Sequence, residues 1–385
     1  MVIAGGGIGG LAAALACHRA GCDVSLCEQA HVFSEVGAGL QLGPNAVRVL
    51  DAWGLGDAAR RVAARPLRLQ VLDATSGQPL GGLRLGDAFR QRYRTDYLTF
   101  HRADLLQVLL QAVQEAGIPL HLQARVSQVL EDDAQVRIVC EDGRTYTGEG
   151  LIGCDGVWSQ VRQHLLGDGR PVWTGHLAYR TLLVPGDLPA GLARDQVTVW
   201  LGPQLHAVAY PVRGGELFNL VVVIEGQHPG DPQSWDHEAN GKILLQRLSH
   251  EDALLRNLVA CAMQWKLWML HDRDPVQGAH QMARGRIALL GDASHAMRPY
   301  QAQGAGMALE DAGELEFCLV QSGSSVPEAL QRYAQARWQR NAWVQQRSRR
   351  NGRIFHADGL FRWARNIGMW LGGESLLDSP VLYGR

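Results

Sequence analysis

The chain has 385 residues, of which 46% are hydrophobic, and its 37 basic and 38 acidic residues leave a net charge of −1. A near-neutral chain gives no electrostatic reason to expect a nucleic-acid partner, and no apolar stretch reaches the roughly 18 residues of a membrane span. The length predicts two closely joined domains rather than one.

Seven cysteines occur without a C-x-x-C pair, and the histidines lack H-E-x-x-H or a comparable spacing. We therefore expect reduced thiols and no metal site. Because the sequence opens directly on an apolar run that predicts a strand, we expect no secretory leader. These features predict a cytoplasmic protein without stable membrane association.

The N-terminus carries a glycine-rich turn. The segment Gly5-Gly6-Gly7-Ile8-Gly9-Gly10 matches G-x-G-x-x-G, after a short apolar run at 2–4 and before a helical stretch at 11–20. Strand, turn and helix in this order are typical of a dinucleotide site, in which glycines let the backbone approach a pyrophosphate at the helix N-terminus. We expect cofactor contacts at Gly5, Gly7, Gly9 and Gly10.

An acidic residue follows at the distance that this motif requires. The second strand, over 23–27, ends at Glu28, 21 residues beyond Gly7. A carboxylate there accepts hydrogen bonds from both hydroxyls of an adenosine ribose and repels a 2′-phosphate. Gln29, directly after it, and Val126, at the start of a later strand, are also expected to bind the cofactor.

Periodicity predicts the later elements in chain order. Helices are expected over 44–53 and 102–116, with a strand over 67–73 between them, and further strands over 126–130, 135–140 and 145–154. From Trp173 to Glu225 the alternation is strand-like, which predicts an inserted antiparallel sheet of strands over 176–184, 196–201, 205–212 and 216–225. A buried strand returns over 286–290, and the chain is helical from Gln303 onward.

Two further signatures follow the first motif. Cys154-Asp155-Gly156 ends a strand, and Gly291-Asp292 follows the returning buried strand. Asp292 presents a carboxylate to polyol hydroxyls, and Gly304 and Ala305 open the next helix, whose N–H groups stabilise negative charge. Together the three motifs outline a site for FAD.

The three ordered motifs resemble those of the aromatic-ring hydroxylases, single-component flavoprotein monooxygenases that use FAD, NAD(P)H and O₂. The resemblance spans nearly the whole chain. It implies that Asp155 takes part in FAD and NAD(P)H binding and that Asp292 binds the flavin ribityl chain. It also implies that a flavin C4a-hydroperoxide transfers OH to an electron-rich ring.

The expected fold is α/β, with a discontinuous Rossmann-like FAD-binding domain, an inserted antiparallel-sheet substrate domain and a helical C-terminus. We place the FAD-binding domain, which includes some strands of the substrate side, at 1–172 and 272–325. The substrate domain is expected at 173–271, and the C-terminal helices at 326–385.

Two segments indicate which members of this family the chain resembles most. Residues 35–46 and 101–105 look like those of salicylate, 3-hydroxybenzoate and 6-hydroxynicotinate hydroxylases, in which the arginine matching Arg102 binds the FAD pyrophosphate. The alternative for Arg102 is a surface position near a helix start. Gln41 departs from the 6-hydroxynicotinate enzymes, which carry a histidine there, and this weakens the heteroaromatic alternative.

Three residues are the catalytic candidates. His206 and Tyr210 lie four residues apart, on one face of a strand expected to look toward the flavin, where they can bind a phenol and help remove its proton. From the pattern alone, satisfied core polar residues are the better explanation. The resemblance favours catalysis, because Tyr210 matches a catalytic tyrosine of the 6-hydroxynicotinate enzymes. Gln303, in a loop like that of 3-hydroxybenzoate 6-hydroxylases, either orients the substrate or caps the next helix.

The C-terminal stretch from Ile354 to Leu371 interleaves aromatic and aliphatic residues with arginines. Such a stripe favours a core or a dimer interface over a membrane contact, so a homodimer stays an open alternative. We expect the stretch to cover the substrate side of the molecule.

We expect an FAD-dependent, NADH-preferring monooxygenase that hydroxylates a small phenolic acid, with a 3-hydroxybenzoate-like compound favoured. Its partners are then a small aromatic substrate and O₂. One alternative is a decarboxylating hydroxylase of the salicylate or 6-hydroxynicotinate type. Another is a flavin-binding redox sensor or carrier without an organic substrate. An NAD-linked dehydrogenase is disfavoured, because the chain has one G-x-G-x-x-G motif.

Overall fold

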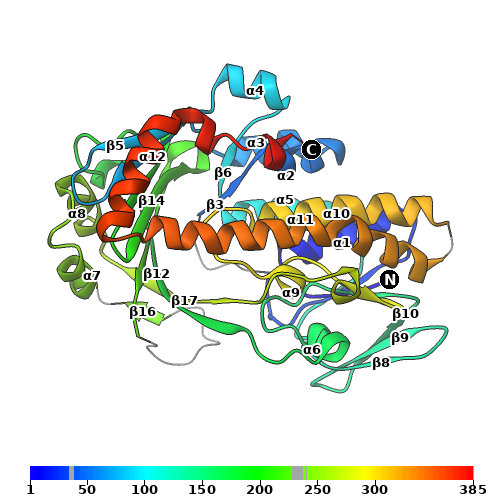
Figure 1. The fold of residues 1–385 in the computed structure, drawn as a ribbon. Helices are drawn as coiled ribbons and strands as arrows, with labels where there is room; N and C mark the ends of the chain where they lie inside the picture. The colour runs from blue at the N-terminus through cyan, green and yellow to red at the C-terminus, as the bar shows by residue number, and fades with distance from the viewer. Residues whose placement is uncertain (34–38, 228–236, 240, 324, 385) are drawn as a thin grey trace. The chain divides into compact units, whose positions relative to one another are not determined.

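The computed structural model describes residues 1–33, 39–227, 237–239, 241–323 and 325–384 (Figure 1). Contacts within the chain separate it into two units. Unit 1 comprises Met1–Glu35, Leu105–Val172 and His271–Arg349, and unit 2 comprises Val36–Asp104, Trp173–Leu270 and Arg350–Arg385. Each unit has a sheet and an apolar core of its own.

Unit 1 is built on a six-stranded sheet with the order β18-β19-β11-β1-β2-β7. Its pairs are parallel except for β18 with β19. Helices α1 (Ile8–Arg19) and α10 (Gly304–Gln321) pack against each other (Figure 1). The strands are β1 (Val2–Ala4), β2 (Ser25–Cys27), β7 (Leu120–His121), β11 (Leu151–Gly153), β18 (Ala283–Arg284) and β19 (Ile287–Leu289).

A second, three-stranded sheet of unit 1 contains β8 (Val126–Glu131), β9 (Val136–Cys140) and β10 (Thr145–Gly148). The single strand predicted over 145–154 is wrong. Residues of this segment form β10, which pairs with β9, and then β11, which pairs with β1 and β19 in the six-stranded sheet. The chain changes sheets between Gly148 and Leu151, a step that alternation along one segment cannot reveal.

Unit 2 is built on an eight-stranded sheet with the order β16-β17-β12-β15-β14-β13-β4-β5. The sequence predicts an antiparallel sheet, but β13 and β4 are parallel. A parallel neighbour arises because β4 comes from an earlier part of the chain and reaches the sheet by a long connection. The strands are β4 (Arg68–Asp73), β5 (Pro79–Arg84), β12 (Val172–Leu183), β13 (Gln196–Gly202), β14 (Leu205–Val212), β15 (Leu217–Glu225), β16 (His237–Ala239) and β17 (Trp265–Asp272).

The two units differ from the domain boundaries expected from the sequence. Residues 36–104 belong to unit 2 rather than to the FAD-binding part, because β4 and β5 extend the eight-stranded sheet. The ribbon of β3 (Gly39–Leu42) and β6 (Leu98–His101) lies on the same unit, where Thr99 Oγ1 donates to the Pro211 carbonyl at 2.6 Å. The expected C-terminal helical part is also divided, since α11 (Val326–Phe355) begins in unit 1 and ends in unit 2.

The two faces of the eight-stranded sheet carry different side chains. One face is apolar and packs against α7 (Gly241–Arg247) and α8 (Ala253–Ala260) in a cluster that includes Trp200, Phe218 and Leu258. The other face carries polar residues at alternate positions of the same strands. This polar face holds His176 and Arg180 of β12, His206 and Tyr210 of β14, and Asn219 and Glu225 of β15.

The remaining helices complete the two units. Among the described residues, no helix combines the length and the apolar character needed to cross a membrane. These helices are α2 (Pro44–Ala52), α3 (Gly56–Val62), α4 (Asp87–Tyr93), α5 (Arg102–Glu115), α6 (Gln160–Leu166), α9 (Asp292–His295), α12 (Gly359–Leu377) and α13 (Pro380–Tyr383).

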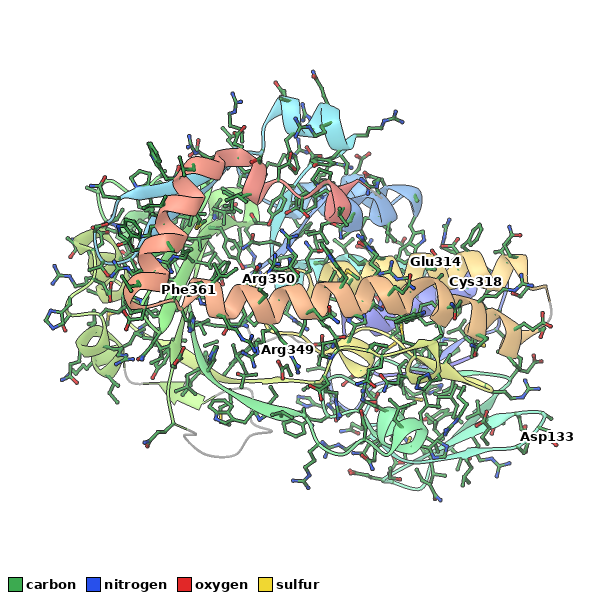
Figure 2. All side chains as sticks on the ribbon, viewed as in Figure 1. Asp133, Glu314, Cys318, Arg349, Arg350 and Phe361 are labelled. Carbon is green, nitrogen blue, oxygen red and sulfur yellow. The ribbon has the colours of Figure 1, made fainter. Side chains whose placement is uncertain are left out.

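Helix α12 does not bury its large apolar side chains. Leu360 is 87% exposed and Trp370 is 72% exposed, and Phe361, labelled in Figure 2, is also exposed. The buried residue of the helix is Arg365, whose Nη1 donates to the carbonyls of Ile354 and Phe355 at 3.2 and 2.9 Å. Of the two expectations for this aromatic stretch, core is therefore wrong for these positions, and a dimer interface stays a prediction.

A buried network of charges joins three helices of unit 1. Asp311 of α10 accepts hydrogen bonds from His295 Nε2 at 2.5 Å, from Arg337 Nε at 2.7 Å and from Asn341 Nδ2 at 3.1 Å. Burial alone would raise the pKa of Asp311, but His295 and Arg337 lower it from 3.8 to about 2. The network ties α9, which follows the buried strand β19, to α10 and α11.

We expect Asp311→Asn to lower the stability of unit 1 by about 2 kcal/mol at pH 7, because the buried Arg337 loses one of its two carboxylate partners and keeps only Glu310, at 2.9 Å. The depressed pKa contributes stability that is present above 3.8 and lost as pH falls toward about 2. Thermal unfolding followed by circular dichroism from pH 7 to pH 3 should thus show the gap between wild type and variant narrowing below about pH 4. The exposed Asp133, labelled in Figure 2, supplies the control Asp133→Asn. Equal Tm values for all three proteins at pH 7 would contradict the assignment.

Candidate functional site

The glycine-rich turn brings backbone segments of unit 1 into close approach. Gly5 has φ +103°, a Cβ there would overlap the carbonyl of Cys154, and a Cβ at Gly10 would overlap the carbonyl oxygen of Gly5. Gly9 lies against buried side chains. Gly7 is the N-cap of α1 without a side-chain cap, and a Cβ on it would meet no described atom within 4 Å. The N–H groups of this helix end therefore suit an anion such as a pyrophosphate.

Glu28 lies at the end of β2, beside this turn. Its carboxylate accepts hydrogen bonds from the backbone N–H of Gly6 at 2.5 Å and of Ala30 at 2.8 Å. The structure thus brings together the acid and the turn that the sequence predicts as one site. Gln29 is exposed, and its Oε1 accepts a hydrogen bond from Arg125 Nε at 3.1 Å.

The carboxylate of Asp155 forms hydrogen bonds with other residues of unit 1. It accepts hydrogen bonds from the Ser159 hydroxyl, from the backbone N–H of Gln160 at 2.7 Å and from that of Val161 at 3.1 Å, at the start of α6. Burial raises the pKa of Asp155, against the opposing effect of these hydrogen bonds. Asp155 therefore shapes the turn after β11, and its direct contact with a cofactor stays a prediction.

The third motif places Asp292 next to the start of α10. Gly291 has φ +64°, in the left-handed region that favours glycine, and it turns the chain out of β19. Asp292 is exposed although both of its neighbours are buried. A Cβ at Gly304 would lie 4.0 Å from Asp292 Oδ1, and Ala305 follows in the same helical turn. The acid and the helix N-terminus predicted from the sequence are thus neighbours.

Two other predicted residues have local surroundings that the sequence does not reveal. Gln303 is buried at the N-cap of α10, but its side chain makes no capping hydrogen bond, so the capping explanation is wrong. Val126, the first residue of β8, packs in the core of unit 1 with Ala4 and Cys27. Because the side chain of Val126 is part of the core, only its backbone atoms could contact a cofactor.

In unit 2, Tyr210 belongs to a buried polar group. The Gly39 N–H donates to Asn219 Oδ1 at 2.6 Å, and a Cβ at Gly39 would lie 2.6 Å from the Tyr210 ring. The Tyr97 hydroxyl donates to Gln41 Oε1 at 2.6 Å. Burial raises the pKa of Tyr210, against the lowering effects of Arg180 and of a hydrogen bond with Gln41. The phenol therefore keeps its proton at neutral pH.

His206 lies on the same face of β14 as Tyr210, roughly 13 Å along the strand. Its Nδ1 is 2.9 Å from Nε2 of His356, and its ring meets the Phe355 ring edge-on, at 5.5 Å between centroids. Burial, together with His356 and His176, lowers the pKa of His206 well below its usual value. The imidazole is therefore neutral at pH 7.

Arg180 is a candidate that the sequence did not single out. It lies on β12, on the same face of the sheet as Tyr210, with its guanidinium carbon 3.6 Å from the centroid of the Trp268 ring. Its buried Nε has no hydrogen-bond partner, and it forms no ion pair with a carboxylate, among the described residues. Burial lowers the pKa of Arg180 to about 10, so the side chain stays charged at neutral pH.

Arg102 is the first residue of α5. Its charge lowers the pKa of Arg180, which puts the two guanidinium groups within electrostatic range of each other in unit 2. Contact of Arg102 with a pyrophosphate stays a prediction. Of the neighbouring segment over 35–46 that carries part of the family resemblance, residues 35–38 lie outside the described residues.

Comparisons with known proteins agree with this geometry. A family model for an FAD binding domain matches residues 1–348 of the 385-residue chain. The chain is 39% identical, over 376 residues, to a 3-hydroxybenzoate 6-hydroxylase of Polaromonas naphthalenivorans (strain CJ2), which covers 97% of this chain and 92% of the relative.

Two further relatives cover the full length of the chain. A 6-hydroxynicotinate 3-monooxygenase of Bordetella bronchiseptica (strain ATCC BAA-588 / NCTC 13252 / RB50) is 34% identical over 389 aligned positions, covering 100% of this chain and 97% of the relative. A solved structure described as a salicylate hydroxylase substrate complex aligns with a TM-score of 0.84 at 27% identity, covering 100% of this chain and 95% of that chain. The chain therefore belongs to the FAD-binding family of aromatic hydroxylases and is a flavin-dependent enzyme.

Proposed function

We propose that the enzyme hydroxylates a small phenolic acid, with a 3-hydroxybenzoate-like compound favoured, using NADH and O₂. In the balanced reaction, one oxygen atom of O₂ enters the ring as a hydroxyl group, the other leaves as water, and NADH supplies two electrons. Bound FAD supplies the oxidation and reduction chemistry. The protein's own residues bind the substrate, orient it and hold or move its phenolic proton.

The cofactor part of the proposal is supported by unit 1. The open N-terminus of α1 at Gly7 suits the pyrophosphate, Glu28 suits the ribose and the exposed Asp292 suits the ribityl chain. Gly304 and Ala305, at the start of α10, offer backbone N–H groups to a reduced flavin ring. Asp155 acts as a positioning residue through its hydrogen bonds to α6.

One observation carries the substrate class, namely the charged Arg180 without a carboxylate partner among the described residues. A buried cation is costly unless an anion compensates it, and a guanidinium group suits a carboxylate because both are planar. Arg180 and Tyr210 lie on strands that are two positions apart, roughly 10 Å between strand axes. This separation leaves room for one aromatic ring, with its carboxylate at Arg180 and its hydroxyl near Tyr210.

The proposed proton chemistry uses Tyr210 and His206. Tyr210 keeps its own proton, so it donates a hydrogen bond to the phenolate that forms on the substrate. His206 is neutral, and because burial lowers its pKa well below the usual value it is proposed to act through hydrogen bonds rather than as a charged imidazolium. Gln41 forms hydrogen bonds with Tyr97 and Tyr210. The 6-hydroxynicotinate enzymes carry an ionisable histidine at this position, so the glutamine favours a benzenoid acid as the substrate over a hydroxynicotinate. Gln303 is proposed to orient the phenol or the carboxylate beside the flavin.

NADH is proposed as the reductant, because the sequence contains no basic cluster recognisable as a partner for the 2′-phosphate of NADPH. We expect 3-hydroxybenzoate to accelerate NADH oxidation by the FAD-loaded enzyme and to yield a dihydroxybenzoate that retains its carboxylate. Mass spectrometry of reactions with 3-hydroxybenzoate, salicylate and 6-hydroxynicotinate, each with NADH and NADPH, measures this. Loss of CO₂ would favour the decarboxylating alternative, and no organic product from any compound would favour a redox sensor. A tenfold preference for NADPH, about 1.4 kcal/mol in kcat/KM, would contradict the choice of NADH.

Tyr210→Phe removes one hydroxyl oxygen, so we expect FAD binding and the anaerobic flavin spectrum to stay nearly unchanged. Hydroxylation should slow by about 10²-fold or more, because the substrate phenolate loses a hydrogen-bond partner, while NADH oxidation continues and H₂O₂ accumulates. His206→Gln should uncouple the reaction in the same way. The measurement is the ratio of hydroxylated product to NADH consumed. Tyr146→Phe, which changes a tyrosine of unit 1 in the same way, is the matched control. If both variants formed one hydroxylated product per NADH consumed, as the wild type is expected to do, Tyr210 and His206 would have only structural roles.

Arg180→Met keeps most of the side-chain volume and removes the charge. If Arg180 binds the carboxylate, the Kd of 3-hydroxybenzoate should rise by roughly 10- to 100-fold, the value of a charge-assisted hydrogen bond. The Kd of phenol, which lacks the carboxylate, should barely change. Arg350→Met, at an exposed arginine labelled in Figure 2, controls for the loss of one positive charge. Equal weakening for both ligands would mean that Arg180 acts through folding of the site rather than through the carboxylate.

A further inference from the structure

Three side chains of metal-ligating type meet in unit 2, although they are far apart in the sequence. His176 of β12 lies directly opposite Glu225 of β15 in the antiparallel register, and His356 follows the last residue of α11. One ligand atom from each lies within 4.8 Å of the other two. Within the part of the chain that the structure describes, this is the one such group of histidine, cysteine and acidic side chains.

We propose that His176, Glu225 and His356 form a binding site for a divalent transition metal such as Zn²⁺. Two imidazole nitrogens and one carboxylate are a common protein ligand set for zinc, with water in the fourth position. Ca²⁺ and Mg²⁺ prefer oxygen ligands, so two histidines argue against them.

One pair of the three ligand atoms already has the spacing that a tetrahedral ion requires. Nδ1 of His356 lies 3.2 Å from Oε1 of Glu225, and two atoms bonded to one zinc ion at about 2.1 Å lie about 3.4 Å apart. The His176 ring stacks on the His356 ring, with centroids 4.8 Å apart and an interplanar angle of 21°. The ligand nitrogen of His176 lies within 4.8 Å of the other two ligand atoms, so it would have to move closer by about 1 Å to reach the same ion.

A fourth residue supports the assignment of His356 as a ligand. While Nδ1 of His356 faces Glu225, Nε2 of the same ring lies 2.9 Å from Nδ1 of His206. Metal-ligating histidines usually bond through their second ring nitrogen to a neighbouring group, which fixes the ring orientation and the tautomer. His206 supplies that outer contact.

The residues around the proposed metal site differ in their exposure to solvent, which indicates how an ion could enter. His176 and His356 are buried, whereas the Glu225 side chain is 43% exposed, so an ion can enter from solvent on the Glu225 side. A bound ion would tie the end of α11 to β12 and β15 and would hold His206 through His356. The three ligands are different residues from Arg180 and Tyr210, and the site shares only its outer contact, His206, with the proposed proton chemistry.

The test uses the FAD-loaded enzyme, freed of metals with a chelator, dialysed and titrated with Zn²⁺ by isothermal titration calorimetry. We expect one Zn²⁺ per chain. Glu225→Gln and His176→Asn should each weaken binding by at least about tenfold, the lower limit for losing even an outer contact of a ligand. The matched controls Glu141→Gln and His164→Asn change exposed residues of unit 1 and should retain full affinity.

Thermal unfolding separates a lost ligand from a lost fold. Without zinc, Glu225→Gln should match the wild type in Tm and in FAD content, since Glu225 is exposed. Zinc should raise the Tm of the wild type and leave that of Glu225→Gln unchanged. Absence of stoichiometric binding, or equal affinity in ligand and control variants, would overturn the site. Because the readout is zinc binding, either result leaves the proposed substrate to be judged by its own experiments.

Discussion

Strand register in the eight-stranded sheet of unit 2 is the constraint on which the proposed substrate site depends. Side chains alternate between the two faces of a strand, so a shift of one residue would exchange the faces completely. The observed register sends Trp200 and Phe218 into the core with α7 and α8. The same register leaves Arg180 and Tyr210 together on the polar face. The apolar core and the polar candidate site are therefore two results of one pairing pattern.

The candidate cofactor site of unit 1 is formed by backbone atoms more than by side chains. At Gly5 and Gly10 the chain approaches other backbone atoms too closely for a side chain. Glu28 and Asp155 use their carboxylates to accept backbone N–H groups beside the turns that they shape. Such an arrangement suits a ligand that is bound along its length by peptide groups and a few carboxylates, as FAD requires.

Buried charges in the two units differ in how they are compensated. Asp311 has three side-chain hydrogen-bonding partners within unit 1, together with the backbone N–H of Gly291, and holds helices together. Arg180, by contrast, rests on the face of Trp268 and has no carboxylate partner among the described residues. A buried charge that is paired within the protein has a structural role. A buried charge without such a partner indicates a ligand, because a lone buried charge is unfavourable.

The sequence by itself determined the elements whose signals are local. The glycine-rich turn, the acid at Glu28, the helix at α2 and the strands β13 to β15 follow from turn chemistry and from side-chain periodicity, which depend on near neighbours. Tertiary structure alone decided that residues 36–104 join unit 2, that 145–154 divides between two sheets and that α12 buries Arg365. It alone placed Arg180 on Trp268 and gathered the histidines near Glu225. Strand pairing and charge compensation join residues that are far apart in the chain, and no pattern within a single segment contains that information.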